Sequence, residues 1–253
     1  MTSNTHPASL PPSGLPGLDP FWSRLVTGAD AEGIDRTWHV LDNRVEAPAV
    51  TLLCVHGNPT WAYLWRTLLS SVPPDVRVVA VDHLDMGYSE RTGTLRRLEQ
   101  RIDDLSAVVA ALDVNGPVVT VAHDWGGPIS LGWAAAHREQ LAGIVLMNTA
   151  VHQPQGAAAP TLIRMARSRP VLGPLSVGTS GFVTGTLRLS KKRPSRTVRA
   201  AFHAPYGSAA RREAIGAFVA DIPLEEDHPS RPALDRIVDS LRDCLLYTSD
   251  AAD

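Results

Sequence analysis

Short, continuous runs of apolar residues recur along the first 150 positions of the chain. Four of them are rich in valine and isoleucine and do not alternate with polar residues: Thr51–Val55, Val76–Val81, Val118–Ala122 and Ile144–Met147. Such runs are typical of strands that a parallel sheet buries on both faces. The segment Arg36–Leu41 is expected to add an antiparallel edge strand.

The segments between these runs show helical periodicity. One helix face is predicted from Trp61, Leu64, Trp65, Leu68 and Leu69, and a second from Leu98, Ile102, Leu105, Val109 and Leu112. A third helix is expected from Gly126 to about Arg138. Strands that alternate with helices across short connections predict a doubly wound α/β sheet.

The pattern changes after Met147, where buried-strand runs stop and helical stretches are broken by prolines. We expect an α/β core over residues 21–150, a helical cap over 151–235 and a return to the core at 236–243. Residues 1–20 carry five prolines and no apolar stretch typical of a signal peptide, so a disordered leader is predicted. Residues 244–253 lack the arginine that is common upstream and are expected to be a non-native tail.

Composition narrows the class of protein. Charged residues make up 20% of the 253 positions and the formal net charge is −2, which favours neither nucleic acid nor a membrane surface as a partner. The apolar runs are far shorter than the roughly 18–20 residues that span a bilayer. Cys54 and Cys244 cannot make a disulfide framework, and Cys54 is expected in the core. A cytoplasmic protein without metal or cofactor is expected, with its oligomeric state open.

The strongest chemical motif is VAHDWGG at 121–127, where a predicted strand turns into a predicted helix. Small residues two positions before and after Asp124 are typical of the nucleophile elbow of α/β-hydrolases, which usually carries serine. A carboxylate at this position suits attack on a saturated carbon that bears a leaving group, and leaves an ester on the enzyme. The alternative is an aspartate that only caps the helix.

A second motif, His56-Gly57-Asn58-Pro59-Thr60, follows the first buried run directly. In this fold the corresponding loop supplies a backbone N–H to the reacting centre. The side chains of Asn58 and Trp125 add two N–H donors that could hold a departing anion without a metal. The alternatives are a turn role for Asn58 before proline and a packing role for Trp125.

Other polar candidates carry weaker signals. Asp82 and Asp85 follow a strand and are expected to order the next loop, while His83 and His152 are expected at the pocket mouth or as exposed loop histidines. Lys191 and Lys192 are expected on a solvated face.

The segments HGNPTWAYLWR (56–66) and HDWGG (123–127) resemble the haloalkane dehalogenase family of the α/β-hydrolase superfamily, over roughly residues 34–243. The resemblance implies that Asp124 displaces a halide from a small hydrophobic substrate, while Asn58 and Trp125 hold the halide. A histidine-activated water then hydrolyses the ester. One branch of the family contains β-lactone decarboxylases of olefin synthesis, to which the stretches at 82–89 and 148–154 are similar.

Three further alternatives remain beside the dehalogenase. The β-lactone decarboxylase uses the same Asp, Asn and Trp set. An epoxide hydrolase is disfavoured, since Tyr206 is the only tyrosine between Tyr88 and Tyr247. A non-catalytic remnant is the fourth possibility. Asn148 stands where one branch has an acid, so the resemblance implies a histidine and an acid beyond residue 253, with the last strands of the sheet.

Overall fold

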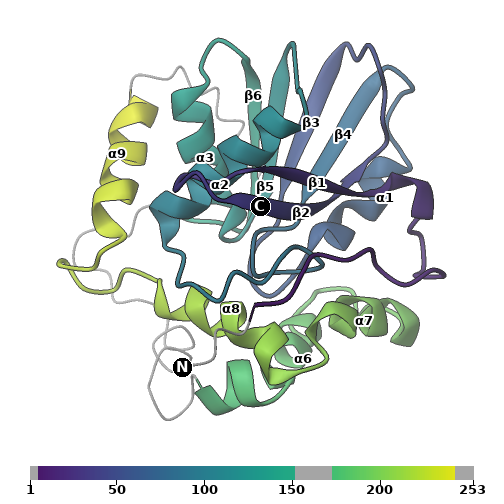
Figure 1. Cartoon of the computed structure of the whole chain (residues 1–253), viewed down its shortest axis with the longest axis vertical. Helices are drawn as coiled ribbons and strands as arrows, with labels where there is room; N and C mark the ends of the chain where they lie inside the picture. Colours follow the sequence, from purple (N-terminus) through teal and green to yellow (C-terminus); the bar gives the residue numbers. More distant parts are fainter. Residues whose placement is uncertain (1–4, 152–172, 243–253) are drawn as a thin grey trace.

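A six-stranded sheet forms the centre of the protein, in the order β1-β2-β4-β3-β5-β6 (Figure 1). The structure, a computed structural model, describes residues 5–151 and 173–242. The strands are β1 (Ser23–Ala29), β2 (Asp35–Asp42), β3 (Val50–Val55), β4 (Val76–Val81), β5 (Val118–His123) and β6 (Leu141–Met147). The last four pair in parallel, which confirms the sheet predicted from the continuous apolar runs.

The antiparallel strand predicted at 36–41 is present as β2, but it does not lie at the edge of the sheet as expected. β2 pairs antiparallel with β1 on one side and with β4 on the other, so β1 forms that edge of the sheet. The five residues of β2 from Trp38 to Asp42 are therefore buried. β1 escaped prediction because only Ser23 and Val26 of its SRLVTGA sequence are buried, which leaves no continuous apolar run.

Helices connect the parallel strands. Their bounds are α1 (Arg66–Leu69), α2 (Leu98–Ala111) and α3 (Gly126–Ala136), with short 3-10 turns at Pro20–Trp22 and Ala62–Trp65. The helix expected from Trp61 begins as a 3-10 turn instead, because Trp61 has an extended backbone (φ −150°, ψ 177°). Helix α3 is buried around most of its surface, since it packs against both the sheet and α2.

The described chain after β6 is helical, in agreement with the pattern broken by prolines. It comprises a π-helical turn at Gly173–Gly178, α6 (Gly181–Arg188), α7 (Arg196–His203), a 3-10 turn at Ala204–Tyr206, α8 (Ala209–Ala220) and α9 (Arg231–Arg242). Helices α6, α7 and α8 lie together below the sheet in Figure 1, whereas α9 lies beside α3. Helix α9 runs without a break through the expected boundary at residue 235.

Residues 5–20 differ from the expected disordered leader, because they are held against the core. His6 forms an antiparallel bridge with Arg91, and the Tyr63 hydroxyl donates a hydrogen bond to the Pro16 carbonyl at 2.6 Å. Leu18 is buried. Proline limits the backbone conformations of the unfolded chain, so this segment loses less conformational entropy when it becomes ordered. The tail expected at 244–253 lies outside the described residues.

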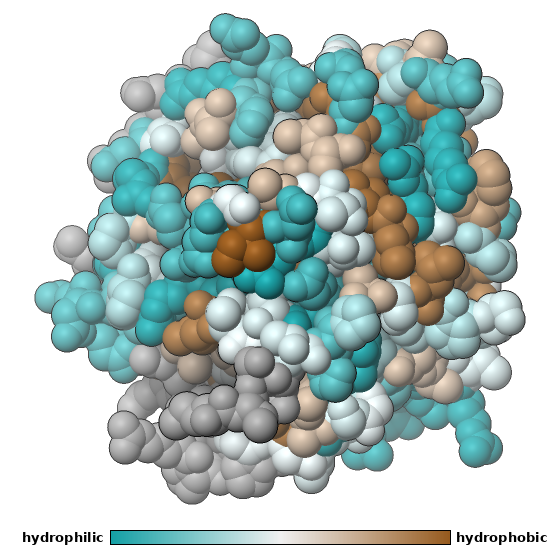
Figure 2. Space-filling model, in the orientation of Figure 1, coloured by the Kyte–Doolittle hydropathy of each residue, from teal (hydrophilic) through white to brown (hydrophobic). Residues whose placement is uncertain are grey.

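The surface is mixed in character. The face in Figure 2 is mostly hydrophilic, with separate hydrophobic groups. None of the helices in the described ranges has the length and apolarity needed to cross a membrane.

Candidate functional site

Asp124 occupies a sharp turn between β5 and α3, at the carboxyl end of the parallel strands. Its φ of +52° lies in the left-handed region, as expected for a nucleophile elbow. The turn needs glycine nearby, because a Cβ on Gly126 would lie 2.1 Å from the Val55 carbonyl oxygen. A Cβ on Gly57 would lie 2.4 Å from Oδ2 of Asp124. The two glycines let the β3 loop and the elbow approach closely.

Asp124 is half-buried, and its carboxyl group receives backbone hydrogen bonds. The Asn58 N–H donates to Oδ2 at 2.7 Å. Burial raises the pKa of Asp124 above the usual 3.8, and the backbone N–H groups of Trp125 and Asn58 oppose that rise, as does the nearby His123. The N–H groups thus favour the carboxylate form that a nucleophile requires.

The side chains of Asn58 and Trp125 both contact helix α8. The Asn58 side-chain amide donates to the Ile215 carbonyl at 3.0 Å, and the Trp125 ring lies edge-on to Phe218 at 5.6 Å between centroids. No described residue accepts a hydrogen bond from the Trp125 indole N–H. The structure therefore brings all three predicted site residues together, with the remaining Asn58 amide hydrogen and the indole N–H as donors.

A cavity of about 430 Å³ opens beside Asp124 and Trp125. Its wall comes from the elbow, the segment after β6, the α8–α9 connection and α9 itself. The other lining residues are Pro128, Asn148, Thr149, Ala150, Val151, Ile222, Pro223, Arg231, Leu234 and Asp235. Apolar side chains dominate this wall, so the cavity suits a small hydrophobic molecule whose reactive carbon meets the carboxylate.

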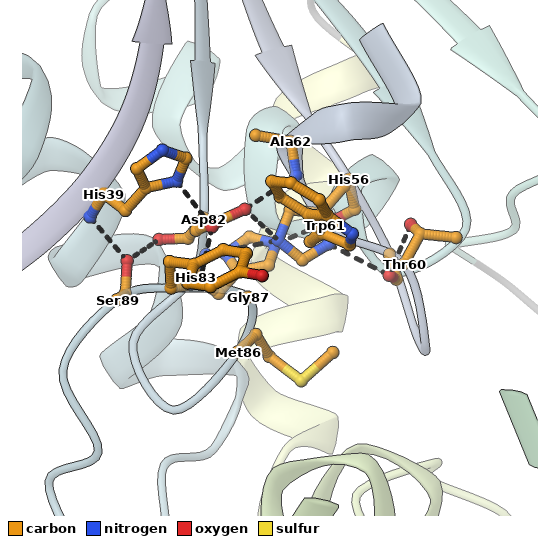
Figure 3. Close-up of polar contacts among 12 residues, drawn as sticks. His39, His56, Thr60, Trp61, Ala62, Asp82, His83, Met86, Gly87 and Ser89 are labelled. Carbon is orange, nitrogen blue, oxygen red and sulfur yellow. Dashed lines mark hydrogen bonds and ion pairs between the residues drawn. The ribbon is translucent and has the colours of Figure 1, made fainter. Parts of the chain in front are cut away.

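A buried polar cluster fixes the loops behind the site (Figure 3). The carboxylate of Asp82 accepts the N–H of Ala62 at 2.6 Å, the N–H of Tyr88 at 2.8 Å and the ring N–H of His39 at 2.8 Å. These bonds join the loop that carries Asn58 to β2 and to the loop after β4. The expected role of Asp82 in ordering that loop is confirmed.

His56 and His83 link the same two loops in both directions. The backbone N–H of His83 donates to Nε2 of His56 at 3.2 Å, and Nε2 of His83 donates to the His56 carbonyl at 2.8 Å. Burial lowers the pKa of both rings, so they are neutral near neutral pH. His83 is only 5% exposed, so the expectation of a pocket-mouth or exposed histidine is wrong. His152 lies outside the described residues.

Three contributors to the site escaped prediction: His39, Ile215 and Phe218. His39 lies on a strand expected at the sheet edge, where a buried charge partner is not anticipated. Ile215 contributes only a backbone carbonyl, for which a sequence carries no signal. No described histidine hydrogen-bonds Asp124, and the histidine and acid implied beyond residue 253 remain a prediction.

Known proteins match this arrangement. A family model described as alpha/beta hydrolase fold matches residues 50–170. A cis-3-alkyl-4-alkyloxetan-2-one decarboxylase of Xanthomonas campestris is 34% identical over 202 residues, which cover 75% of this chain and 67% of that protein. Haloalkane dehalogenase 2 of Mycobacterium bovis is 30% identical over 224 residues, covering 88% and 73%. The solved structure of haloalkane dehalogenase DbeA from Bradyrhizobium elkani superposes with a TM-score of 0.74 at 25% identity, covering 87% and 76%.

The fold and the elbow define an α/β-hydrolase. The chain belongs to the haloalkane dehalogenase-like family of this superfamily. The oxetanone decarboxylases are also relatives of this chain. It spans 58% of the length of a second decarboxylase relative, from Shewanella oneidensis.

Proposed function

We propose that Asp124 is a nucleophile that displaces an anionic leaving group from a saturated carbon of a hydrophobic substrate. The observation that carries this proposal is the carboxylate itself, placed at a left-handed elbow beside a cavity of about 430 Å³ and held by the Asn58 N–H at 2.7 Å. A serine esterase would need a hydroxyl at this position. The cytoplasmic location expected from the sequence remains a prediction.

For a haloalkane, a carboxylate oxygen of Asp124 forms a bond to the carbon while the carbon–halogen bond breaks. The halide leaves with the bonding electron pair, and an alkyl ester remains on Asp124. The free amide hydrogen of Asn58 and the indole N–H of Trp125 are the donors for the departing halide. Hydrolysis of the ester needs a base that activates water, and that half of the reaction depends on residues beyond those described.

A second candidate is the opening and decarboxylation of a β-lactone, favoured by the names of the two decarboxylase relatives, which are 34% and 33% identical. Attack of Asp124 on the saturated ring carbon breaks its bond to the ring oxygen and frees a carboxylate. Loss of carbon dioxide then forms a carbon–carbon double bond and expels Asp124 as a free carboxylate. This sequence balances without water, so it needs no hydrolytic base.

The two reactions are separated by their products. The chain is incubated with 1-bromohexane, with bromide measured, and with a cis-dialkyl β-lactone, with carbon dioxide measured. A haloalkane-type site gives about one bromide per chain, or continuous release if a base is present, and no carbon dioxide. Repeated carbon dioxide release with inert bromohexane assigns the decarboxylase instead.

Matched variants complete the test. Asp124→Asn should abolish either product, whereas Asp35→Asn, on an exposed position of β2, should leave it unchanged. If neither substrate reacts with the folded chain, or if Asp124→Asn reacts as fast as the parent, the proposal is overturned.

A further inference from the structure

A second cavity, of about 200 Å³, lies between the loop after β4, the start of α2 and the cap helix α8. We propose that this cavity is a binding site for a compact monovalent anion, centred on the guanidinium group of Arg101. Arg91 and Arg96 also line the cavity. None of its lining residues belongs to the cavity beside Asp124, so the two sites are separate.

Arg101 is a buried cation that has no hydrogen-bonding partner among the described residues. Its side chain is on α2 and the residue is 2% exposed. Its Nε has no partner, and no described residue accepts a hydrogen bond from the rest of its guanidinium group. The group instead lies over the ring of Phe218, 3.5 Å from the centroid. An unpaired buried charge costs several kcal/mol, so the group favours a bound anion.

Arg91 adds positive charge, and within residues 5–151 and 173–242 no carboxylate lies at hydrogen-bond distance from it. Its terminal nitrogens donate to backbone carbonyls, among them those of Met86, Ser89 and Gly87, and its Nε has no partner. A carbonyl satisfies a hydrogen bond without cancelling the charge. Burial lowers the pKa of Arg91 and that of Arg101 to about 10, so both remain protonated near neutral pH.

Acidic groups are present and offset part of this charge. Arg96 is paired with Asp104 at 2.6 Å and with Asp30 at 2.9 Å, and the cavity wall also contains Asp85 and Glu213. Burial raises the pKa of Asp104 to about 7 and also raises that of Asp85. Asp221 also acts electrostatically on Arg101. Because Asp104 and Asp30 are engaged by Arg96, Arg101 itself has no carboxylate at hydrogen-bond distance among the described residues.

The dimensions and donors define the class of ligand. A cavity of this volume admits a halide with water or a short carboxylate, and excludes a nucleotide. A planar guanidinium matches a carboxylate in a two-point hydrogen bond and also attracts a halide by charge. The shared chemistry is a small anion that carries one charge.

An anion bound beside Arg101 could affect the site around Asp124, because helix α8 contacts both. Phe218 of α8 contacts Arg101 on one side and Trp125 on another, at 5.6 Å between ring centroids. The same helix holds the side chain of Asn58 through the Ile215 carbonyl.

The direct test is a crystal of the chain soaked in sodium bromide, with bromine located by its anomalous scattering. The expected result is a bromine peak within hydrogen-bond distance of Arg101. If acetate added to the soak removes this peak, the site prefers carboxylates; if the peak stays, the site prefers halides. No peak with either ion, when the cavity contains only water, overturns the proposal.

A solution test uses the midpoint of thermal unfolding in sodium HEPES with added sodium bromide or acetate. Arg101→Met should weaken anion binding in this cavity at least roughly tenfold and so reduce the stabilisation, and the stabilisation that remains is that of an anion held by Asn58 and Trp125. Arg211→Met is the matched control, since Arg211 is a nearby cation on α8 that does not line the cavity. If both variants lose the effect equally, the ion acts on overall charge and the site is disproved; the crystal test holds even if Arg101→Met fails to fold.

Discussion

At the scale of single residues, Asp124 combines a conformation and an environment that both oppose stability. A left-handed backbone on a residue other than glycine costs of order 1–3 kcal/mol, and a buried carboxylate loses its hydration. The backbone N–H groups of Asn58 and Trp125 offset part of that loss, and so does the nearby His123. A group that weakens the fold in this way is what the proposed nucleophile role of Asp124 would require.

The stability of an Asp124→Asn variant follows from this shift. Because burial raises the folded pKa above the usual 3.8, Asp124 stabilises the fold below that pH, and the contribution is lost as the pH rises through the raised pKa. Near neutral pH the neutral amide should therefore increase the free energy of unfolding by roughly 0.5–2 kcal/mol. Urea denaturation measures this change, and Asp35→Asn should show none. A less stable Asp124→Asn variant would contradict the assigned cause of the shift.

At the scale of elements, the parallel strands and the elbow could be predicted because burial on both faces and a strand–turn–helix junction leave local signals. Strand β1 could not, since only Ser23 and Val26 are buried and its sequence has neither a continuous apolar run nor a regular alternation. The bond from Asn58 to Ile215 joins positions 157 residues apart, and it depends on how α8 docks. Residue types alone carry no information about that docking.

The loops after β3 and β4 should depend on Asp82. Asp82→Asn replaces one acceptor oxygen with a donor that faces backbone N–H groups, so we expect a loss of about 3 kcal/mol in the free energy of unfolding. Because Ala62 and Asn58 share a loop, alkylation at Asp124 should also slow in the fraction that remains folded. Ser89→Ala is the control, since it removes a hydroxyl that donates to the Asp82 carbonyl and accepts the His39 N–H but leaves the Asp82 carboxylate in place. It should lose about 1–2 kcal/mol, less than Asp82→Asn, and keep the alkylation rate. Equal effects of the two variants would contradict a positioning role of the carboxylate.

At the scale of the whole molecule, the sheet is asymmetric. β1 has mostly exposed or half-buried positions at one edge, whereas β6 ends the described sheet on the other side. Val145, Leu146 and Met147 of β6 are 44%, 43% and 37% exposed. Successive residues of a strand point to opposite faces, so both faces of β6 expose apolar side chains.

An exposed apolar edge strand favours association between chains. We expect the 253-residue chain to self-associate at micromolar concentration, and Leu146→Lys to reduce that association. Light scattering against concentration measures it, with Leu189→Lys as the control for an exposed leucine on the cap. If the two substitutions reduce scattering equally, β6 is not the surface responsible.

The central claim, that Asp124 is the nucleophile, is tested most directly by locating the alkyl group after reaction with 1-bromohexane. The chain is digested with trypsin, and the peptide from Ile102 to Arg138 is fragmented in a mass spectrometer. The account predicts one hexyl ester, on Asp124 and on none of Asp103, Asp104 and Asp113 in the same peptide. An unmodified peptide after release has stopped at about one bromide per chain, or a hexyl group on another residue, would contradict it.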